Sequence, residues 1–175
     1  MEIINRKYEE ISKYKNKNSL FNKIWEMEGN AVGQIGELFI RSLFQYNNLP
    51  MDHDKDKTIH DEYDILSRGK KIEIKTAREG LKTKTFQFNG INPDYNHDYI
   101  ILIGISSDEF YYHILDGHAV KYDHKSRKKF IMFNDQPRQL VPMNPNNHVN
   151  FKLTLTAKDL KKSEELEKQL IQLFQ

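Results

Sequence analysis

The alternation of polar and apolar residues between residues 62 and 76 predicts a β-hairpin. Arg68-Gly69 separates the two alternating runs, and the glycine supplies the positive φ that a two-residue turn requires. The turn sets a register with three cross-strand pairs, of which the last two share an apolar face: Ser67 with Lys70, Ile65 with Ile72, and Tyr63 with Ile74.

The opposite face of this hairpin is charged. It brings Asp64 opposite Glu73, with Lys75 beside Glu73 and opposite Glu62. Directly opposed like charges destabilise a sheet, whereas a hard divalent cation between them would use their oxygens as ligands. The pair is therefore a candidate metal site. The alternative is a half-buried hairpin with a solvated charged face, and this stretch alone does not separate the two.

Other stretches predict further strands. The near-continuous apolar run 98–105 is typical of a strand that is covered on both faces. Residues 109–115 alternate well enough to be its antiparallel neighbour, residues 85–88 form a short strand ended by the turn Asn89-Gly90, and residues 151–155 alternate as a late strand. With the helices described next, this order predicts an α/β fold, a central mixed β-sheet flanked by helices.

Residues 29–46 carry an apolar stripe at helical spacing. Gly33 and Gly36 each cost roughly 1 kcal/mol relative to alanine in a helix interior, so we expect another part of the molecule to approach this helix closely. Glu37 lies one turn beyond Gly33 and shares that thin face. It is either a site residue or a solvated glutamate beside packing glycines.

Two later segments complete the chain. Residues 116–150 lose periodicity and contain the densest positive patch, residues 121–129, followed by several prolines and asparagines. A charge run of this kind is usually a solvated face, but here it is also the best candidate for a phosphate contact. Residues 157–174 predict a charged amphipathic helix capped by Thr156.

Composition narrows the class of protein. The 175 residues fit one domain, which we expect to span 1–175 with a core of about 20–115 and 150–175 and a variable region at 116–150. The 27 basic residues are offset by 25 acidic ones, so a nucleic-acid partner must be argued from local clusters. The absence of cysteine excludes disulfides and cysteine-ligated metals. No apolar run of about 18 residues and no signal-like start occur, so we expect a cytoplasmic protein without membrane contact.

Three pieces of the sequence occur in the order of a known nuclease superfamily. Asp64 followed by Glu73-Ile74-Lys75 resembles the PD-(D/E)xK motif, with Tyr63 in place of the proline. Gly33-x-x-Gly36-Glu37 resembles the upstream helix that brings an additional glutamate to that site. With the strand end Gln87–Ile91, these pieces resemble small type II restriction endonucleases.

The resemblance implies a restriction-endonuclease-like core and a Mg²⁺-dependent endonuclease that cuts double-stranded DNA at a short specific site. Mg²⁺ would be held by Asp64, one oxygen of Glu73 and the main-chain carbonyl of Ile74; Mn²⁺ would substitute, and Ca²⁺ would support binding only. Lys75 would orient or help deprotonate the attacking water and offset the charge that builds on phosphorus. Glu37 would hold a second metal ion or a water bound to one, or would position Lys75.

The clear overlap runs from about residue 29 to residue 115, and the remainder looks like the variable part that reads DNA in such enzymes. Lysines and arginines would contact phosphates, which gives affinity without sequence information, and amides would lie near a groove. The candidate DNA contacts are Gln34, Lys82, Lys84, Gln87, Asn89, Lys121, Lys125, Arg127 and Lys128.

Several alternatives remain at the level of sequence. An enzyme of the same fold could be a junction resolvase, a repair or nicking enzyme, or a defence nuclease, and a non-catalytic DNA-binding module would use the hairpin only structurally. A homodimer is expected because one nuclease core attacks one strand. The terminal helix offers an apolar face either for that interface or for packing on its own sheet: Leu160, Leu166, Leu170, Ile171 and Phe174.

Overall fold

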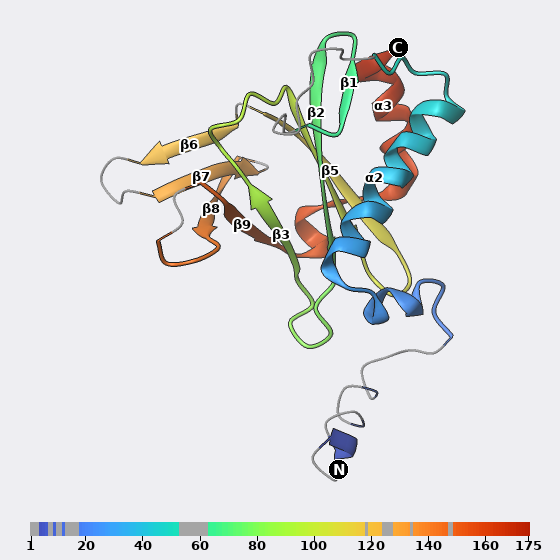
Figure 1. The fold of residues 1–175 in the computed structure, drawn as a ribbon, viewed down its shortest axis with the longest axis vertical. Helices are drawn as coiled ribbons and strands as arrows, with labels where there is room; N and C mark the ends of the chain where they lie inside the picture. Colours follow the sequence, from blue (N-terminus) through green and yellow to red (C-terminus); the bar gives the residue numbers. More distant parts are fainter. Residues whose placement is uncertain are drawn as a thin grey trace.

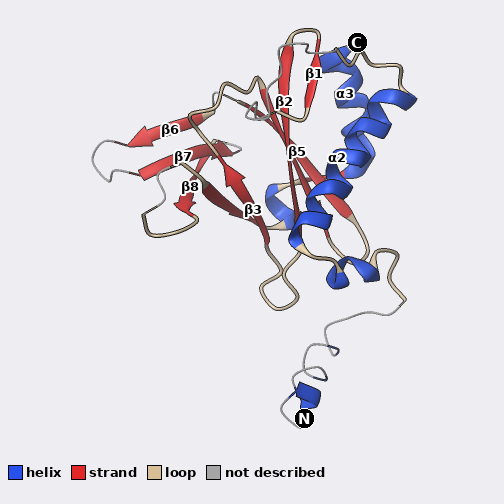
Figure 2. Cartoon of the chain, in the orientation of Figure 1, coloured by secondary structure: helices blue, strands red, loops and turns tan. Residues whose placement is uncertain are grey.

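The computed structural model describes residues 4–6, 9, 12, 18–52, 63–117, 119–123, 128–133, 135–146 and 149–175. Its helices, with 3-10 helices written η, include η1 (Asn22–Glu26), α2 (Gly29–Tyr46), η2 (Ala157–Asp159), η3 (Ser163–Glu165) and α3 (Leu166–Phe174). Its strands are β1 (Ile65–Ser67), β2 (Lys70–Arg78), β3 (Phe86–Ile91), β4 (Tyr99–Ile105), β5 (Phe110–Asp116), β6 (Val120–Asp123), β7 (Lys128–Phe133), β8 (Gln136–Pro142), β9 (Phe151–Leu155) and β10 (Lys161–Lys162). Figures 1 and 2 show two groups of strands, with α2 and α3 on the side of the first sheet away from β6, β7 and β8.

The first sheet has the strand order β1-β2-β4-β5-β10. It is mixed, because β2 and β4 run parallel and the other neighbours run antiparallel. Every residue from Ile100 to Ile105 in β4 is buried, since one set of side chains faces the helices and the other faces the second sheet. The predicted central mixed sheet, its doubly covered strand and the antiparallel neighbour β5 are therefore confirmed.

The second sheet has the order β3-β9-β8-β7-β6 and is antiparallel throughout. A buried cluster joins it to the first sheet, with Leu102 and Leu115 on one side and Phe88, Phe133 and Leu153 on the other. The predicted helices therefore flank the central sheet on one face only, because a second sheet covers the other.

The region 116–150 is also more regular than its sequence indicates, because it supplies β6, β7 and β8. In β8 only Leu140 is buried, so this strand lacks the alternation by which a half-buried strand is recognised. The late strand at residues 151–155 is confirmed as β9.

The helices α2 and α3 cover the remaining face of the first sheet (Figure 1). Their buried residues meet directly, and the rings of Phe44 and Phe174 lie 5.3 Å apart. Leu166, Leu170 and Phe174 are all buried in this layer, so the apolar face of α3 packs on its own chain rather than forming a dimer interface. Among the described helices, none is long and apolar enough to cross a membrane.

The C-terminal helix begins at Leu166 and not, as the sequence predicts, at Ala157. The chain first runs along the free edge of β5, where Lys161 and Lys162 pair with Tyr112 and Tyr111. Thr156 still caps, but it caps the short helix η2: its N–H and hydroxyl both donate to the Asp159 carboxylate at 2.8 Å.

The two glycines of α2 have different surroundings. A Cβ at Gly36 would overlap the side chain of Thr76 on β2, whereas a Cβ at Gly33 would meet nothing within 4 Å. The expected close approach to the helix is therefore confirmed at Gly36 only, and it seats α2 directly on β2.

This difference gives a matched pair of variants. Gly36→Ala is expected to destabilise the protein by about 1–3 kcal/mol, because the added methyl must displace α2 or Thr76. Gly33→Ala is expected to be neutral or stabilising by up to about 1 kcal/mol, because it improves helix propensity in open space. Urea unfolding of both variants measures the difference, and equal effects would contradict the contact.

His113 of β5 lies between the two sheets. Its ring centroid is 4.1 Å from that of Phe133, and its buried Nδ1 has no hydrogen-bond partner among the described residues. Burial, with a smaller effect of the Lys161 cation, lowers the pKa of His113 from 6.5 to about 4. The native state therefore holds this imidazole neutral.

Stability should consequently fall as the pH is lowered from 6.5 to 4, since the unfolded chain binds a proton at His113 in this window and the native state does not. The full shift corresponds to about 3 kcal/mol, and partial solvent contact reduces the expected loss to about 1–2 kcal/mol. His113→Leu should show a smaller loss over the same window in chemical unfolding. Parallel pH profiles of variant and wild type would exclude His113 as the cause.

Candidate active site between α2, β2 and β3

A cleft of about 830 Å³ lies between the first half of α2, the second half of β2 and the edge strand β3. Six residues predicted from the sequence to be functional line it together: Gln34, Glu37, Ile74, Lys75, Gln87 and Asn89. They come from three elements, α2, β2 and β3, of which α2 is distant in the sequence, so the fold and not local spacing brings them together. The predicted Asp64 and Glu73 are not among the lining residues.

Glu73 and Lys75 form an ion pair on β2 between Oε1 and Nζ. The two residues are two positions apart on a strand, so their side chains share a face. Only 10% of the Glu73 side chain and 23% of the Lys75 side chain are exposed. The Lys75 side chain extends toward β3 of the second sheet. A Cβ built at Gly90 of β3 would lie 3.7 Å from the Nζ of Lys75. Both charges have lost most of their hydration at this burial, and the attraction between them offsets part of that cost.

Asp64 is held beside β2 in a different way from the one that the sequence predicts. The register of Ser67 with Lys70 and of Ile65 with Ile72 is confirmed, but β1 begins at Ile65, so the expected pairs of Asp64 with Glu73 and of Tyr63 with Ile74 are not part of the ladder.

Instead, the Asp64 N–H donates to the Ile72 carbonyl at 2.9 Å, and the Ile74 N–H donates to Asp64 Oδ2 at 2.6 Å. The carboxylate takes the place of a main-chain acceptor beside β2. It is therefore fixed next to the residue that separates Glu73 from Lys75.

Two arginines that were not predicted from the sequence donate hydrogen bonds to main-chain carbonyls around the site. Arg41 lies one turn beyond Glu37 on α2, and its Nη2 donates to the main-chain carbonyl of Asp64. Arg78, which lines the cleft, donates through Nη1 to the carbonyls of Ile24, Trp25 and Met27 around η1. The spacing of Arg41 from Glu37 on the same helix face was the available signal.

The amides on β3 lie at the mouth of the cleft. Gln87 Nε2 donates to Asn89 Oδ1 at 3.1 Å. Asn89 is not at a turn, as its sequence predicts, but inside β3, where the pairing with β9 shifts between Phe88 and Ile91. Gly90 adopts φ +72° at this irregularity, and the shift leaves the strand continuous.

The predicted basic contacts do not gather in the cleft. Lys84 pairs with Glu79 at 3.4 Å, and Lys82 lies exposed in the same loop. Lys121 and Lys128 are exposed on β6 and β7 of the second sheet, at the edge away from β3. Lys125 and Arg127 lie outside the described residues, as does Glu62.

The donor set beside β2 suits a hard divalent cation. It consists of the Asp64 and Glu73 carboxylates and the Ile74 carbonyl, all oxygen ligands of the type that Mg²⁺ and Ca²⁺ prefer. Within the described ranges, no three His, Asp or Glu side chains form a group that could hold a metal ion. A cation at this point would therefore rely on two carboxylates, completed by a main-chain oxygen and water.

Comparison with known proteins adds no family assignment. The sequence matches no protein-family model, and no curated protein matches it at a significant level. The geometry of the cleft therefore carries the functional argument.

Proposed function

We propose that this chain is a Mg²⁺-dependent endonuclease of the PD-(D/E)xK type that hydrolyses phosphodiester bonds of double-stranded DNA, most simply as a type II restriction enzyme. The observation that carries the proposal is the poorly exposed Glu73–Lys75 ion pair, whose lysine lines the cleft, with the Asp64 carboxylate accepting a hydrogen bond from the N–H of Ile74, the residue between the two. This combination puts the Asp64 carboxylate against the main chain of β2, at the residue that separates the Glu73 carboxylate from the Lys75 ammonium group.

Each residue has a distinct role in this proposal. A divalent cation held by Asp64, Glu73 and the Ile74 carbonyl would polarise the phosphoryl oxygen and acidify the attacking water. Lys75 orients that water and offsets the negative charge that develops on phosphorus. Glu73 keeps the ammonium group in place, and Arg41 fixes the main chain of Asp64.

The remaining cleft residues suit the substrate. Gln34, Gln87 and Asn89 offer amide donors and acceptors at the mouth of the cleft, and such groups can hydrogen-bond to base edges or to phosphate oxygens. Glu37 faces the cleft from α2 and would act on a second ion, on the water or on Lys75.

A duplex cut requires two such cores, so the proposal includes a twofold homodimer. Its interface would lie away from the apolar face of α3, which is buried within the chain. A nicking or repair nuclease of the same fold is the nearest rival, and the product of plasmid digestion separates them: linear DNA with one defined end sequence for a restriction enzyme, open circles for a nicking enzyme. Digestion with Mg²⁺, followed by sequencing of the ends, is the direct test, with EDTA and Ca²⁺ reactions that should show no cleavage.

Three single substitutions test the catalytic unit. Asp64→Asn, Glu73→Gln and Lys75→Met should each lower the cleavage rate at least a hundredfold, because each removes a charge that acts on the reacting phosphate. Glu109→Gln and Lys162→Met are the matched controls, since they break an ion pair of the same chemistry, 3.2 Å long, on the edge of the first sheet away from the cleft.

Rates should be compared at equal fractions of folded protein, measured by thermal unfolding. An Asp64→Asn enzyme that keeps activity within tenfold of wild type would overturn the proposal.

Glu37→Gln should reduce cleavage by one to three orders of magnitude with little change in melting temperature, because the side chain faces the cleft and the amide keeps its shape. Gln34→Glu, one turn earlier on the same face, is a useful companion, since it adds an acid at the cleft without altering Glu37. A Glu37→Gln variant with full activity and lowered stability would assign Glu37 a purely structural role.

A further inference from the structure

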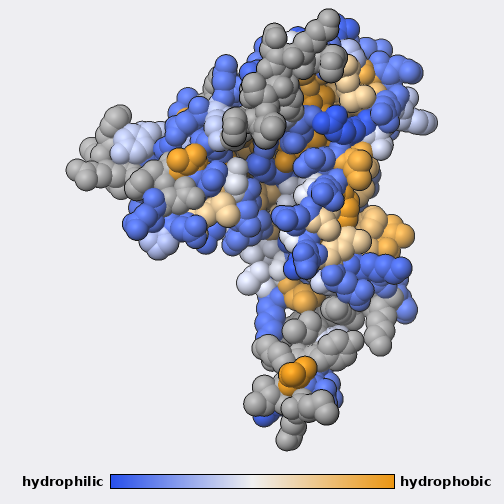
Figure 3. Space-filling view, viewed as in Figure 1, coloured by the Kyte–Doolittle hydropathy of each residue, from blue (hydrophilic) through white to orange (hydrophobic). Residues whose placement is uncertain are grey.

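The second sheet leaves one of its faces uncovered. Its inward row, which includes Ile131, Leu140 and Leu153, is buried against the first sheet. Residues between these alternate to the other side, and none of the described helices covers them (Figure 1). Figure 3 shows the part of the molecule that carries these strands as mainly hydrophilic, with a few separate hydrophobic side chains.

The strand register sets out which residues share this outward face. Gln87 pairs with Thr154, Lys152 with Val141, and Phe130 with both Gln139 and Lys121. Cross-strand partners project to the same side of a sheet, so these positions form one continuous surface from β3 to β6.

The basic residues on the two faces of this sheet differ in whether they form ion pairs. The inward-row cations have acidic partners: Lys129 pairs with Asp94 at 3.2 Å, and Arg138 pairs with Asp159. The outward-row lysines Lys121 and Lys152, by contrast, have no ion pair among the described residues. No acidic residue occupies an outward position of β3, β9, β8 or β7. On β6 the register places Asp123 in the outward row, opposite Lys128, so this row carries three lysines (Lys121, Lys128 and Lys152) and one acid.

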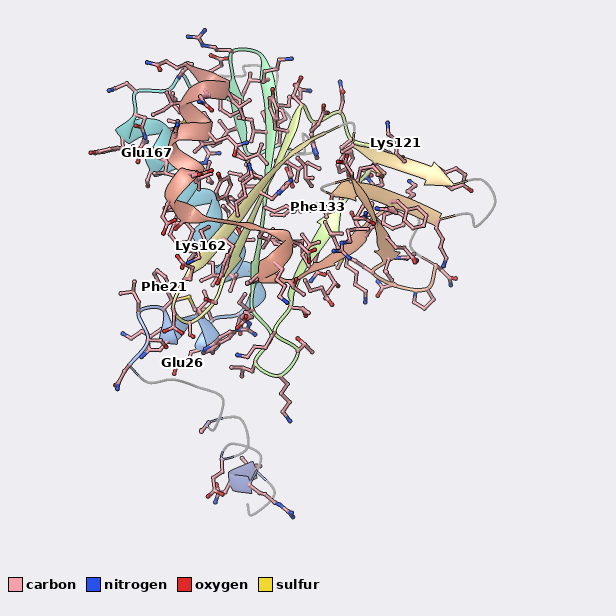
Figure 4. All side chains as sticks on the ribbon, turned by 180° about the vertical axis from the view of Figure 1, so that it is seen from behind. Phe21, Glu26, Lys121, Phe133, Lys162 and Glu167 are labelled. Atoms are coloured by element: carbon pink, nitrogen blue, oxygen red, sulfur yellow. The ribbon has the colours of Figure 1, made fainter. Side chains whose placement is uncertain are left out.

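The outward face begins at the cleft. β3 is both the edge strand of this sheet and a wall of the cleft, and Gln87 belongs to both surfaces. Four strand spacings of about 4.8 Å separate β3 from β6, which gives about 19 Å. That length matches roughly five to six base pairs of a duplex at about 3.4 Å each. Figure 4 shows the arrangement from behind, with Phe133 near the middle of the molecule and Lys121 toward the outer strand.

We propose that the outward face of the second sheet docks the duplex flank next to the bond that is cut, with Lys152 and Lys121 as phosphate contacts. This inference rests on the nuclease function proposed above. The occupant is a nucleic acid because the two lysines have no ion pair within the described part of the chain and because, by register, lysines outnumber acids three to one in the outward row. It is a duplex because the surface is long and adjoins the cleft. Val141, which is exposed between the two lysines, offers an apolar contact for a sugar.

The test is a binding experiment that requires no catalysis. Fluorescence anisotropy in Ca²⁺ compares wild type, Lys121→Gln/Lys152→Gln, and the control Lys158→Gln/Lys168→Gln, which removes the same charge from exposed sites outside the second sheet. Two duplexes carry the same cleavable sequence, one with a ten-base-pair flank and one cut back to two base pairs.

The test variant should bind the long duplex roughly tenfold or more weakly than wild type, and the slope of log K against log salt should fall by about 1.8, or about 0.9 for each lost phosphate contact. The control should stay within twofold of wild type, and the short duplex should show a smaller difference. Equal affinity and equal salt slope for the test variant and wild type would overturn the docking surface.

The same data separate the docking surface from the nuclease function. If wild type cleaves the long duplex with Mg²⁺ and the test variant binds it normally, the nuclease assignment stands and this docking surface is wrong. If wild type neither binds nor cleaves DNA, both are wrong.

Discussion

The structure depends on the strand β2, which packs against the helices with one face and turns the other face toward the second sheet. β2 turns Ile72 and Ile74 toward the helices and Glu73, Lys75 and Ala77 toward the second sheet. An ordinary doubly covered strand, such as β4, uses apolar residues throughout. β2 instead places a carboxylate and an ammonium group on the face that it turns toward the second sheet, where the ion pair between them offsets part of the cost of burying both charges. The cleft opens at this point of β2, where Lys75 lines it.

The elements around β2 are arranged to keep this point fixed. Thr76 rests against Gly36, so α2 lies directly on the strand. The helix then contributes Glu37 to the cleft and the Arg41 bond to the main chain of Asp64. Binding and catalytic sites in general depend on such positional control by rigid elements. Here the helix contacts the strand at Gly36 and the hairpin at Asp64, five residues of α2 apart.

Part of this organisation could be read from the sequence. Strong periodicity predicted the hairpin register, the α2 helix and the doubly buried strand, because each has many apolar positions in a fixed repeat. The segment 116–150 could not be read in this way, because β8 buries a single residue and lies largely in solvent. The early part of the C-terminal segment also misled, since helix propensity there is overridden by pairing of Lys161 and Lys162 with β5.

The candidate site shows the same division. Asp64, Glu73 and Lys75 could be chosen from a short motif, and Glu37 from its place beside glycines. The contribution of Arg41 could not be predicted from the sequence, because it depends on where Asp64 lies in space. The hydrogen bond from the Ile74 N–H to the Asp64 carboxylate could not be predicted either, because it replaces a pair that a regular ladder would have formed. Departures from local rules of this kind are expected where a protein builds a site.

The lengths of the outer strands bear on the tendency of the folded protein to aggregate through its sheet edges. The first sheet ends in β1, with three residues, and β10, with two, so each terminal strand is by itself too short to pair along its length with a strand of another molecule. The longer edge, β3, is interrupted at Gly90 by a shift in its pairing. Short and bulged edges are the means by which natural sheets avoid edge-to-edge aggregation. The irregularity beside Asn89 at the cleft thus also makes this edge a poorer template for a strand of another molecule.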